Sequence, residues 1–282
     1  MSTSTPLTVP QLRATKRPEQ PIVMITAYDF PTAQIVVDAQ VDLILVGDSA
    51  AMVVLGYDST TCIGMDEMLV LSAAVRRGAG STLVVGDMPF GSYQASDELA
   101  ITNATRFVAE GRVDMVKLEG GGLIIDRVAA ITGAGIPVVG HLGLTPQTAV
   151  ALGGYRAQAR DQAAADQLVA DAVRLEQSGA SAIVLEAIPE AVAQLVTERI
   201  TIPTIGIGAG VVTDGQVLVY HDLVGLSRGR APRFVERYAD ANAVLTEAVS
   251  HWADDVRAHR YPAARHTYAM REGETARTSP AK

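Results

Sequence analysis

The chain has 282 residues, which suits two average domains or one closed α/β barrel, a fold of about 250 residues. Its net charge of −8 without a basic block argues against nucleic-acid binding, and no apolar stretch reaches the roughly 18 residues of a membrane span. The single cysteine, Cys62, excludes an intrachain disulfide and a cysteine-rich zinc site. Because residues 1–20 show no signal peptide, we expect a cytoplasmic enzyme with no nucleic-acid or membrane partner.

In the first half of the chain, short runs rich in Val, Ile and Leu alternate with helical patterns, which is typical of strands buried on both faces of a parallel sheet. The predicted strands cover 21–29, 41–48, 82–87, 114–119 and 137–141. The predicted helices cover 33–39, 65–78, the stretch from the N-cap Ser96 through Glu110, and 124–132. The segment 133–137, with two glycines and a proline, ends the last of these helices and restarts a strand.

The second half begins with the segment 142–160, whose length and lack of a period indicate a functional loop. After it we predict helices at 162–178, 189–198 and 232–257, and strands at 182–186, 203–207 and 217–224. Eight strand–helix units without a linker favour one (β/α)8 TIM barrel over 21–260, with 1–20 as an N-terminal extension and 261–282 as a polar tail. A doubly wound open sheet is the main alternative.

Four of the predicted strands end on a carboxylate: Asp48, Asp87, Glu119 and Glu186. Chemistry in parallel α/β proteins gathers at the carboxyl ends of the strands. The first three acids end successive strands, so in a barrel they are neighbours, and oxygen ligands without His or Cys suit Mg²⁺. Each acid alone is equally explained by a helix cap or a surface ion pair, but three in succession favour a magnesium site.

Lys117 lies two positions before Glu119, so strand alternation puts both side chains on one face of the strand. A lysine that faces a barrel interior needs carboxylate partners, and such partners keep it protonated. We therefore favour a role for Lys117 in binding an anionic substrate over the alternative of a Schiff-base nucleophile.

Glu186 ends the sixth strand, across the barrel from the three acids, and its apolar neighbours predict a desolvated carboxylate that serves as a general base. His141 ends the fifth strand between the two groups, where it is expected to donate to a substrate oxygen or simply to be a satisfied polar residue. Ser49 offers a hydroxyl and a backbone N–H to a small carboxylate. A magnesium site opposite a base suits a 2-oxo acid whose α-proton is removed to give a metal-stabilised enolate.

Six ordered motifs carry a family resemblance: Thr26–Asp29, Leu45–Ser49, Asp87–Phe90, Val116–Gly121, Gly140–Gln147 and Ile205–Gly210. Together they resemble the 3-methyl-2-oxobutanoate (ketopantoate) hydroxymethyltransferase family over roughly residues 8–260. The resemblance implies a barrel of the phosphoenolpyruvate mutase/isocitrate lyase type. It also implies transfer of a hydroxymethyl group from 5,10-methylenetetrahydrofolate to 3-methyl-2-oxobutanoate, giving 2-dehydropantoate for pantothenate biosynthesis.

The resemblance further implies roles for individual residues. Asp48, Asp87 and Glu119 match metal positions, while Asp48, Ser49, Asp87 and Lys117 match keto-acid positions, and Glu186 matches the proton acceptor. The implied cofactor is Mg²⁺, the implied co-substrate is 5,10-methylenetetrahydrofolate, and the implied assembly is a homo-oligomer, typically a decamer.

Two segments depart from the family pattern. Ala159 replaces a usual glycine in the loop 153–160, which could stiffen that loop. The segment 227–230 is unusually basic, either as surface variation or as a contact for the anionic tail of folate. The glycine-rich run 206–210 lacks a dinucleotide or P-loop spacing, so we expect it to give room for a ligand.

Two rival functions remain from the sequence. One is a lyase or mutase of the same barrel superfamily acting on another 2-oxo acid; such enzymes commonly place a cysteine in an active-site loop. Cys62 lies outside the matched motifs, which argues against that rival. The other is a metabolite-binding barrel, disfavoured because the matched positions all keep chemically competent side chains.

Overall fold

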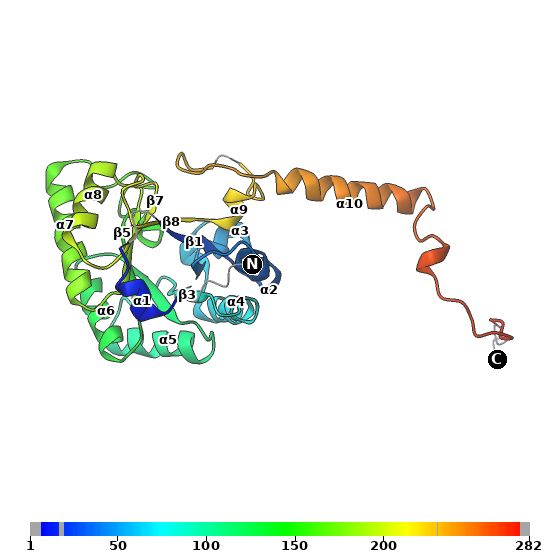
Figure 1. The fold of residues 1–282 in the computed structure, drawn as a ribbon, viewed down its shortest axis with the longest axis horizontal. Coiled ribbons are helices and arrows are strands. Elements are labelled where there is room, and N and C mark those ends of the chain that lie inside the picture. Colours follow the sequence, from blue (N-terminus) through cyan, green and yellow to red (C-terminus); the bar gives the residue numbers. More distant parts are fainter. Residues whose placement is uncertain (1–6, 17–19, 230, 277–282) are drawn as a thin grey trace.

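Eight short apolar runs form parallel strands that pair in chain order, and β8 closes on β1, which makes a complete barrel (Figure 1). The computed structural model describes residues 7–16, 20–229 and 231–276. The strands are β1 (Ile22–Thr26), β2 (Leu43–Val46), β3 (Leu83–Asp87), β4 (Met115–Glu119), β5 (Val138–Gly143), β6 (Ala182–Glu186), β7 (Thr204–Ile207) and β8 (Gly215–Leu218). The closed order confirms the predicted TIM barrel and is inconsistent with an open sheet.

The chain also forms helices, most of which pack around the strands because their amphipathic runs bury one face on the sheet (Figure 1). They are α1 (Val9–Arg13), α2 (Phe30–Asp38), α3 (Ala50–Val53), α4 (Met65–Gly78), α5 (Asp97–Ala109), α6 (Ile124–Gly133), α7 (Gln162–Gln177), α8 (Glu190–Arg199), α9 (Tyr220–Leu223) and α10 (Ala241–Arg257), with 3-10 turns η1 (Thr60–Cys62), η2 (Pro146–Thr148) and η3 (Ala264–His266). In the described ranges no helix combines the length and apolar character needed to cross a membrane.

Helix caps explain where two of these helices begin. Ser96 accepts a hydrogen bond from the backbone N–H of Leu99, which confirms the predicted N-cap of α5. Asp29 accepts from the backbone N–H of Thr32 at 2.7 Å, so α2 begins at Phe30, three residues before the predicted start at 33.

The barrel interior is filled by alternate side chains of the strands, such as Met115, Val139 and Val184. Leu12 of α1 is fully buried and packs against this inner cluster. The predicted N-terminal extension thus contributes a side chain to the barrel core. Two residues further along the same strands, toward their carboxyl ends, the interior positions are polar. These positions form the site described below.

Two predicted elements near the C-terminus are wrong in extent. The eighth strand covers Gly215–Leu218 instead of 217–224, because the chain turns into helix α9 directly after Val219. The last helix begins at Ala241 instead of 232, since Asp240 caps its first turn through the N–H of Ala243. The residues just before that cap bond to the end of α9 instead; for example, the backbone N–H of Tyr238 donates to Leu223.

Helix α10 extends away from the barrel (Figure 1), and none of its residues is buried. Its apolar side chains Leu245, Val249, Trp252 and Val256 recur at helical spacing and are exposed. The predicted barrel range of 21–260 includes this helix, although it packs on no strand in the structure.

Candidate active site

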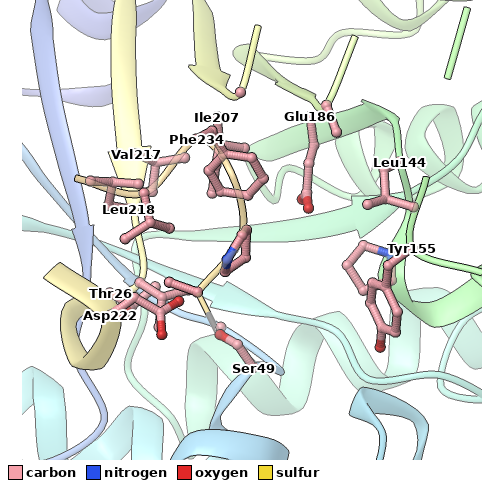
Figure 2. A pocket seen from close by; sticks show the side chains of 18 of the residues that line it. Thr26, Ser49, Leu144, Tyr155, Glu186, Ile207, Val217, Leu218, Asp222 and Phe234 are labelled. Carbon is pink, nitrogen blue, oxygen red and sulfur yellow. The ribbon is translucent and has the colours of Figure 1, made fainter. Parts of the chain in front are cut away.

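A cavity of about 1310 Å³ opens at the carboxyl ends of the strands (Figure 2). Its lining includes every residue singled out from the sequence: Asp48, Ser49, Asp87, Lys117, Glu119, His141 and Glu186. The barrel therefore brings together residues that are up to 138 positions apart, since 186 − 48 = 138.

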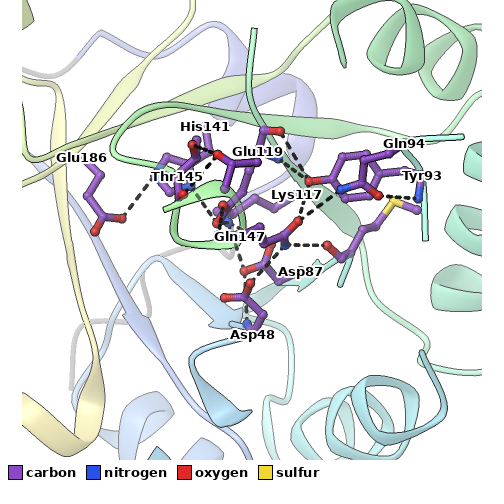
Figure 3. A network of polar contacts seen from close by, with 12 residues as sticks. Asp48, Asp87, Tyr93, Gln94, Lys117, Glu119, His141, Thr145, Gln147 and Glu186 are labelled. Atoms are coloured by element: carbon purple, nitrogen blue, oxygen red, sulfur yellow. Dashed lines mark hydrogen bonds and ion pairs between the residues drawn. The ribbon is translucent and has the colours of Figure 1, made fainter. Parts of the chain in front are cut away.

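Three buried carboxylates crowd one side of the cavity. Asp48, Asp87 and Glu119 each offer an oxygen within 4.8 Å of the others. Lys117 lies among them and is also buried: its Nζ donates to both oxygens of Asp87, at 2.8 and 3.0 Å, and to Glu119 Oε1 at 3.2 Å (Figure 3). This arrangement confirms that Lys117 and Glu119 share the interior face of β4.

The pKa values of this cluster follow from burial and from the surplus of negative charge. Burial alone would lower the pKa of Lys117, but Asp87, Glu119 and Asp48 outweigh it and hold that pKa above its ordinary value. Lys117 is therefore an ammonium, as predicted, and not a free amine. Burial, followed by the charges of Asp87 and Glu119, raises the pKa of Asp48 well above its usual range.

Glu119 differs from Asp48 because more donors converge on it. Burial would raise its pKa, but Lys117, His141 and the backbone N–H of Gln147 lower it to about 2. Glu119 is thus the firmly ionised member of the cluster, whereas the raised pKa of Asp48 makes it the member most easily protonated.

Two residues that the sequence analysis missed hold the carboxylates in place. Gln147 is buried; its side-chain amide donates to Asp48 Oδ2 at 3.0 Å and its backbone N–H donates to Glu119 Oε2 at 3.0 Å. The hydroxyl of buried Tyr93 donates to Gln147 Oε1 at 2.7 Å and in turn accepts from the backbone N–H of Glu119 at 3.2 Å (Figure 3). Gln147 closes the Gly140–Gln147 motif, so a signal for it was present, whereas Tyr93 had none.

His141 connects the acid cluster to Glu186. Its Nδ1 lies 3.2 Å from Glu119 Oε1, and its Nε2 lies 3.2 Å from Glu186 Oε2 (Figure 3). The second contact has ion-pair distance without hydrogen-bond geometry, so Nε2 is a buried nitrogen without a hydrogen-bond partner among the described residues. Burial and Lys117 would lower the pKa of His141, but Glu119 and Glu186 raise it to about 9.

Glu186 lies at the end of β6, and its side chain points into the cavity (Figure 2). Its surroundings are less apolar than its sequence neighbours predicted, because the ring of His141 reaches its carboxylate. The carboxylate is 14% exposed and so remains within reach of a molecule in the cavity.

Ser49 follows Asp48 directly and lines the same cavity. Its hydroxyl lies 2.8 Å from the hydroxyl of Tyr28, which is buried. Desolvation by burial raises the pKa of Tyr28, so this phenol stays protonated and is available to donate to Ser49.

The glycine-rich run after β7 is filled by the protein itself. A Cβ on Gly208 would lie 2.6 Å from the ring of Phe234, and one on Gly210 would lie 2.4 Å from the side chain of Glu190. Both glycines have positive φ values, +65° and +81°. At these two glycines the room is needed for packing; Gly208 also lines the cavity, so the expectation that the run gives room for a ligand stays a prediction.

The loop 142–160 forms one wall of the cavity through Leu144, Pro146 and Tyr155. Ala159, at the position of the expected glycine, is buried with φ +51°. A non-glycine residue in this left-handed region is strained by about 1 kcal/mol. In the basic segment 227–230, Arg228 lines the cavity and Arg230 lies outside the described residues.

The donor set fits a hard divalent cation. Three carboxylates against the single ammonium of Lys117 leave negative charge without a partner, and among the described residues nothing donates to Asp48 Oδ1. Oxygen ligands of this kind suit Mg²⁺, which takes few carboxylates directly and keeps several waters.

Comparison with known protein families matches residues 6–264 to ketopantoate hydroxymethyltransferase. The chain belongs to this family. It is 52% identical over 261 residues to the 3-methyl-2-oxobutanoate hydroxymethyltransferase of Frankia alni, covering 93% of this chain and 86% of the relative. It is 50% identical over 259 residues to the enzyme of the same name from Geobacillus thermodenitrificans, covering 92% and 93%. The family resemblance predicted from the six motifs is confirmed, and the chain is a hydroxymethyltransferase.

Solved structures of more distant proteins share the fold of this hydroxymethyltransferase family member. A phosphonopyruvate hydrolase in complex with oxalate and Mg²⁺ has a TM-score of 0.59 at 14% identity, covering 94% of this chain and 93% of its own. A 2,3-dimethylmalate lyase of the PEP mutase/isocitrate lyase superfamily has a TM-score of 0.58 at 17% identity, covering 88% of each chain. The predicted barrel fold is therefore shared with a member of the PEP mutase/isocitrate lyase superfamily.

Proposed function

We propose that this hydroxymethyltransferase takes its one-carbon unit from 5,10-methylenetetrahydrofolate and transfers it to 3-methyl-2-oxobutanoate. The product is 2-dehydropantoate, an intermediate of pantothenate biosynthesis. The acceptor is supported by the names of the relatives above. The folate donor follows from the family resemblance of the six sequence motifs.

We further propose that the enzyme uses Mg²⁺, held by Asp48, Asp87 and Glu119 either directly or through water. A divalent cation bound there would polarise the keto and carboxylate oxygens of the acid and stabilise negative charge on them. Lys117 keeps Asp87 and Glu119 aligned and adds a positive charge to the subsite of the acid. Ser49 and His141 offer further donors on either side of it.

Glu186 removes the proton from the carbon next to the keto group, which produces an enolate. The enolate carbon then attacks the methylene carbon of the folate, and water supplies the hydroxyl of the transferred group. The two bonds from that carbon to N5 and N10 break, and these nitrogens take up the substrate proton and the second proton of the water as tetrahydrofolate leaves. The single observation that carries this proposal is that Glu186 lies in the same cavity as the three-carboxylate cluster but apart from it, with His141 in contact with both (Figure 3). This separation supports a base and a metal on different sides of one substrate.

The proposal is tested by deuterium exchange. Wild-type enzyme in deuterated water without folate should exchange the proton of 3-methyl-2-oxobutanoate in a Mg²⁺-dependent manner, followed by proton NMR. Addition of 5,10-methylenetetrahydrofolate should convert the acid to 2-dehydropantoate. Absence of both exchange and product would refute the proposed reaction.

The alternative function, that of a lyase or mutase acting on another 2-oxo acid, is less well supported. Cys62 is exposed and does not line the cavity, so the one cysteine of the chain is unavailable as an active-site acid. Product analysis with 3-methyl-2-oxobutanoate and a second 2-oxo acid offered together distinguishes the two functions.

Replacing Asp87 with Asn should weaken Mg²⁺ binding, because an amide oxygen carries no charge. Saturating Mg²⁺ at about 100 times the Kd should stabilise the wild type by about 2.7 kcal/mol in thermal melts. The gain should be smaller by about 1.4 kcal/mol or more in the variant, since a tenfold loss of affinity corresponds to that amount. Asp126→Asn changes an exposed acid of α6 and serves as the control. An unchanged Mg²⁺ titration for Asp87→Asn would contradict ligation by Asp87.

We also propose that the chain assembles as a homo-oligomer through α10. The support is the exposed apolar face formed by Leu245, Val249, Trp252 and Val256 on α10, a helix with no buried residue. A contiguous exposed apolar face of this kind marks a protein–protein interface.

Aspartates on that face should reduce the size of the assembly. We expect Leu245→Asp/Trp252→Asp to elute with a lower molar mass than the wild type in size-exclusion chromatography with light scattering. Ala243→Asp/Ser250→Asp adds the same charge to exposed positions on the other side of the same helix and should leave the mass unchanged. Equal masses for all three proteins would contradict the role of α10.

A further inference from the structure

The cavity is much larger than a five-carbon acid requires. Its volume of about 1310 Å³ exceeds the roughly 300–1,000 Å³ of a pocket that encloses a drug-sized molecule. The acid cluster and Glu186 occupy one end of it. The remaining lining must serve something else: part of it is apolar, and part of it is basic and exposed.

An apolar wall lies next to the acid cluster. Figure 2 shows Ile207, Val217, Leu218 and Phe234 grouped on one side, with Leu144 and Tyr155 on the other. Such walls suit a planar, weakly polar body. The one-carbon donor of the proposed function has such a body in its pterin and benzoyl rings.

Five arginines also line the cavity: Arg156, Arg160, Arg228, Arg233 and Arg237. All five are exposed, and among the described residues none has an ion-pair partner. Of the described lining residues, Asp222 is the one carboxylate outside the catalytic cluster. This arginine rim is a concentration of positive charge on a chain whose net charge is −8.

One half of the arginine rim is held over the cavity by Phe234. The ring of Phe234 packs against Gly208, where a Cβ would be only 2.6 Å away, and contacts the inner core cluster. The backbone N–H of Tyr238 donates to Leu223 at 2.9 Å and secures the same segment further along. Arg233 and Arg237 are thus attached to a segment that is anchored on both sides.

The other half is held by the loop that follows β5. The backbone N–H of Gln158 donates to the carbonyl of Ala187, directly after Glu186, at 2.9 Å. Ala159 is buried beside it. Because Arg156 and Arg160 flank this anchor, the backbone that carries four of the five arginines is tied to the end of the barrel that holds the catalytic carboxylates.

We propose that the arginine rim binds the glutamate carboxylates of the folate, and that it favours folates with more than one glutamate. The inference rests on the proposed function, since it assigns a site to the tail of the proposed one-carbon donor. Guanidinium groups pair with carboxylates through two parallel hydrogen bonds, and each added glutamate brings another carboxylate to the rim. The acid cluster, the apolar wall and the arginine rim then match the reacting carbon, the rings and the tail in that order.

The test compares the KM of the wild type for the mono- and triglutamate forms of 5,10-methylenetetrahydrofolate at low ionic strength. We expect a KM about fivefold to tenfold lower for the triglutamate, which corresponds to one or two partly exposed ion pairs. Arg233→Gln/Arg237→Gln and, separately, Arg156→Gln/Arg160→Gln should reduce this ratio to below about twofold. The corresponding lysine variants retain the positive charge and should keep most of the difference in KM between the two folates.

The matched control is Arg77→Gln/Arg199→Gln, which removes the same charge from two exposed arginines that do not line the cavity. This control should keep the ratio of the wild type. A wild-type ratio near one, or glutamine variants of the rim that retain the wild-type ratio, would overturn the inference. Because the two pairs lie on separate loops, either pair tests it if the other fails to fold. Absence of product from either folate with the wild type would instead refute the proposed function.

Discussion

Replacing Glu186 with glutamine is expected to slow exchange of the substrate proton by about 10²–10⁴-fold, the usual contribution of a general base. Glutamine has the shape of glutamate and can still contact His141, but it cannot take up a proton. Binding of 3-methyl-2-oxobutanoate should change little, because the acid cluster on β2 to β4 is untouched. The exchange rate is measured by NMR in deuterated water without folate, and binding is measured by calorimetry.

The control for this variant is Glu190→Gln, four residues further along the chain. Glu190 is exposed and accepts from the backbone N–H of Val211, and it does not line the cavity. We expect its exchange rate to stay within about twofold of the wild type, as for surface substitutions in general. Exchange at the wild-type rate in Glu186→Gln would show that another group is the base.

The fold and most of the site could be predicted because they depend on local patterns. A short run of Val, Ile and Leu predicts a buried strand. An acid at the end of such a strand is predicted to point into the site once the barrel closes. Asp87, Glu119 and Glu186 are of this kind. The alternation of one strand was sufficient to place Lys117 beside Glu119, and the structure confirms that contact at 3.2 Å.

Other features depend on the path of a loop, which no local pattern determines. Gln147 reaches Asp48 only because the turn η2 folds back over the ends of β2 and β4. Tyr93 reaches Gln147 from a loop 54 positions away in sequence. The error in the eighth strand has a similar origin, since the apolar run from Val217 is compatible with a strand or a helix and the chain turns into α9 after Val219.

Removal of Lys117 should have the largest effect on stability. Lys117 is the buried ammonium that contacts Asp87 and Glu119, so Lys117→Met leaves buried carboxylates without a partner of opposite charge. Breaking a buried ion pair in this way costs about 3–5 kcal/mol of unfolding free energy. Because methionine has a length similar to that of lysine, the loss of unfolding free energy reflects the missing charge more than a cavity. The KM for the keto acid should also rise, because a positive charge disappears from its subsite.

Urea unfolding in the presence of a chelator measures this loss, and Arg257→Met provides the comparison. Arg257 forms a 3.1 Å ion pair with Asp254 in which both side chains are exposed, and its loss should cost less than about 1 kcal/mol. Equal stability of Lys117→Met and the wild type would contradict the expected repulsion between the unpaired carboxylates.

Trapping of the substrate on wild-type Lys117 by borohydride would instead support the Schiff-base mechanism, which needs a free amine. The carboxylates around Lys117 oppose that form, since they raise its pKa despite burial. Charge surplus in the acid cluster thus decides both results: it makes Lys117 indispensable as a cation and unsuitable as a nucleophile.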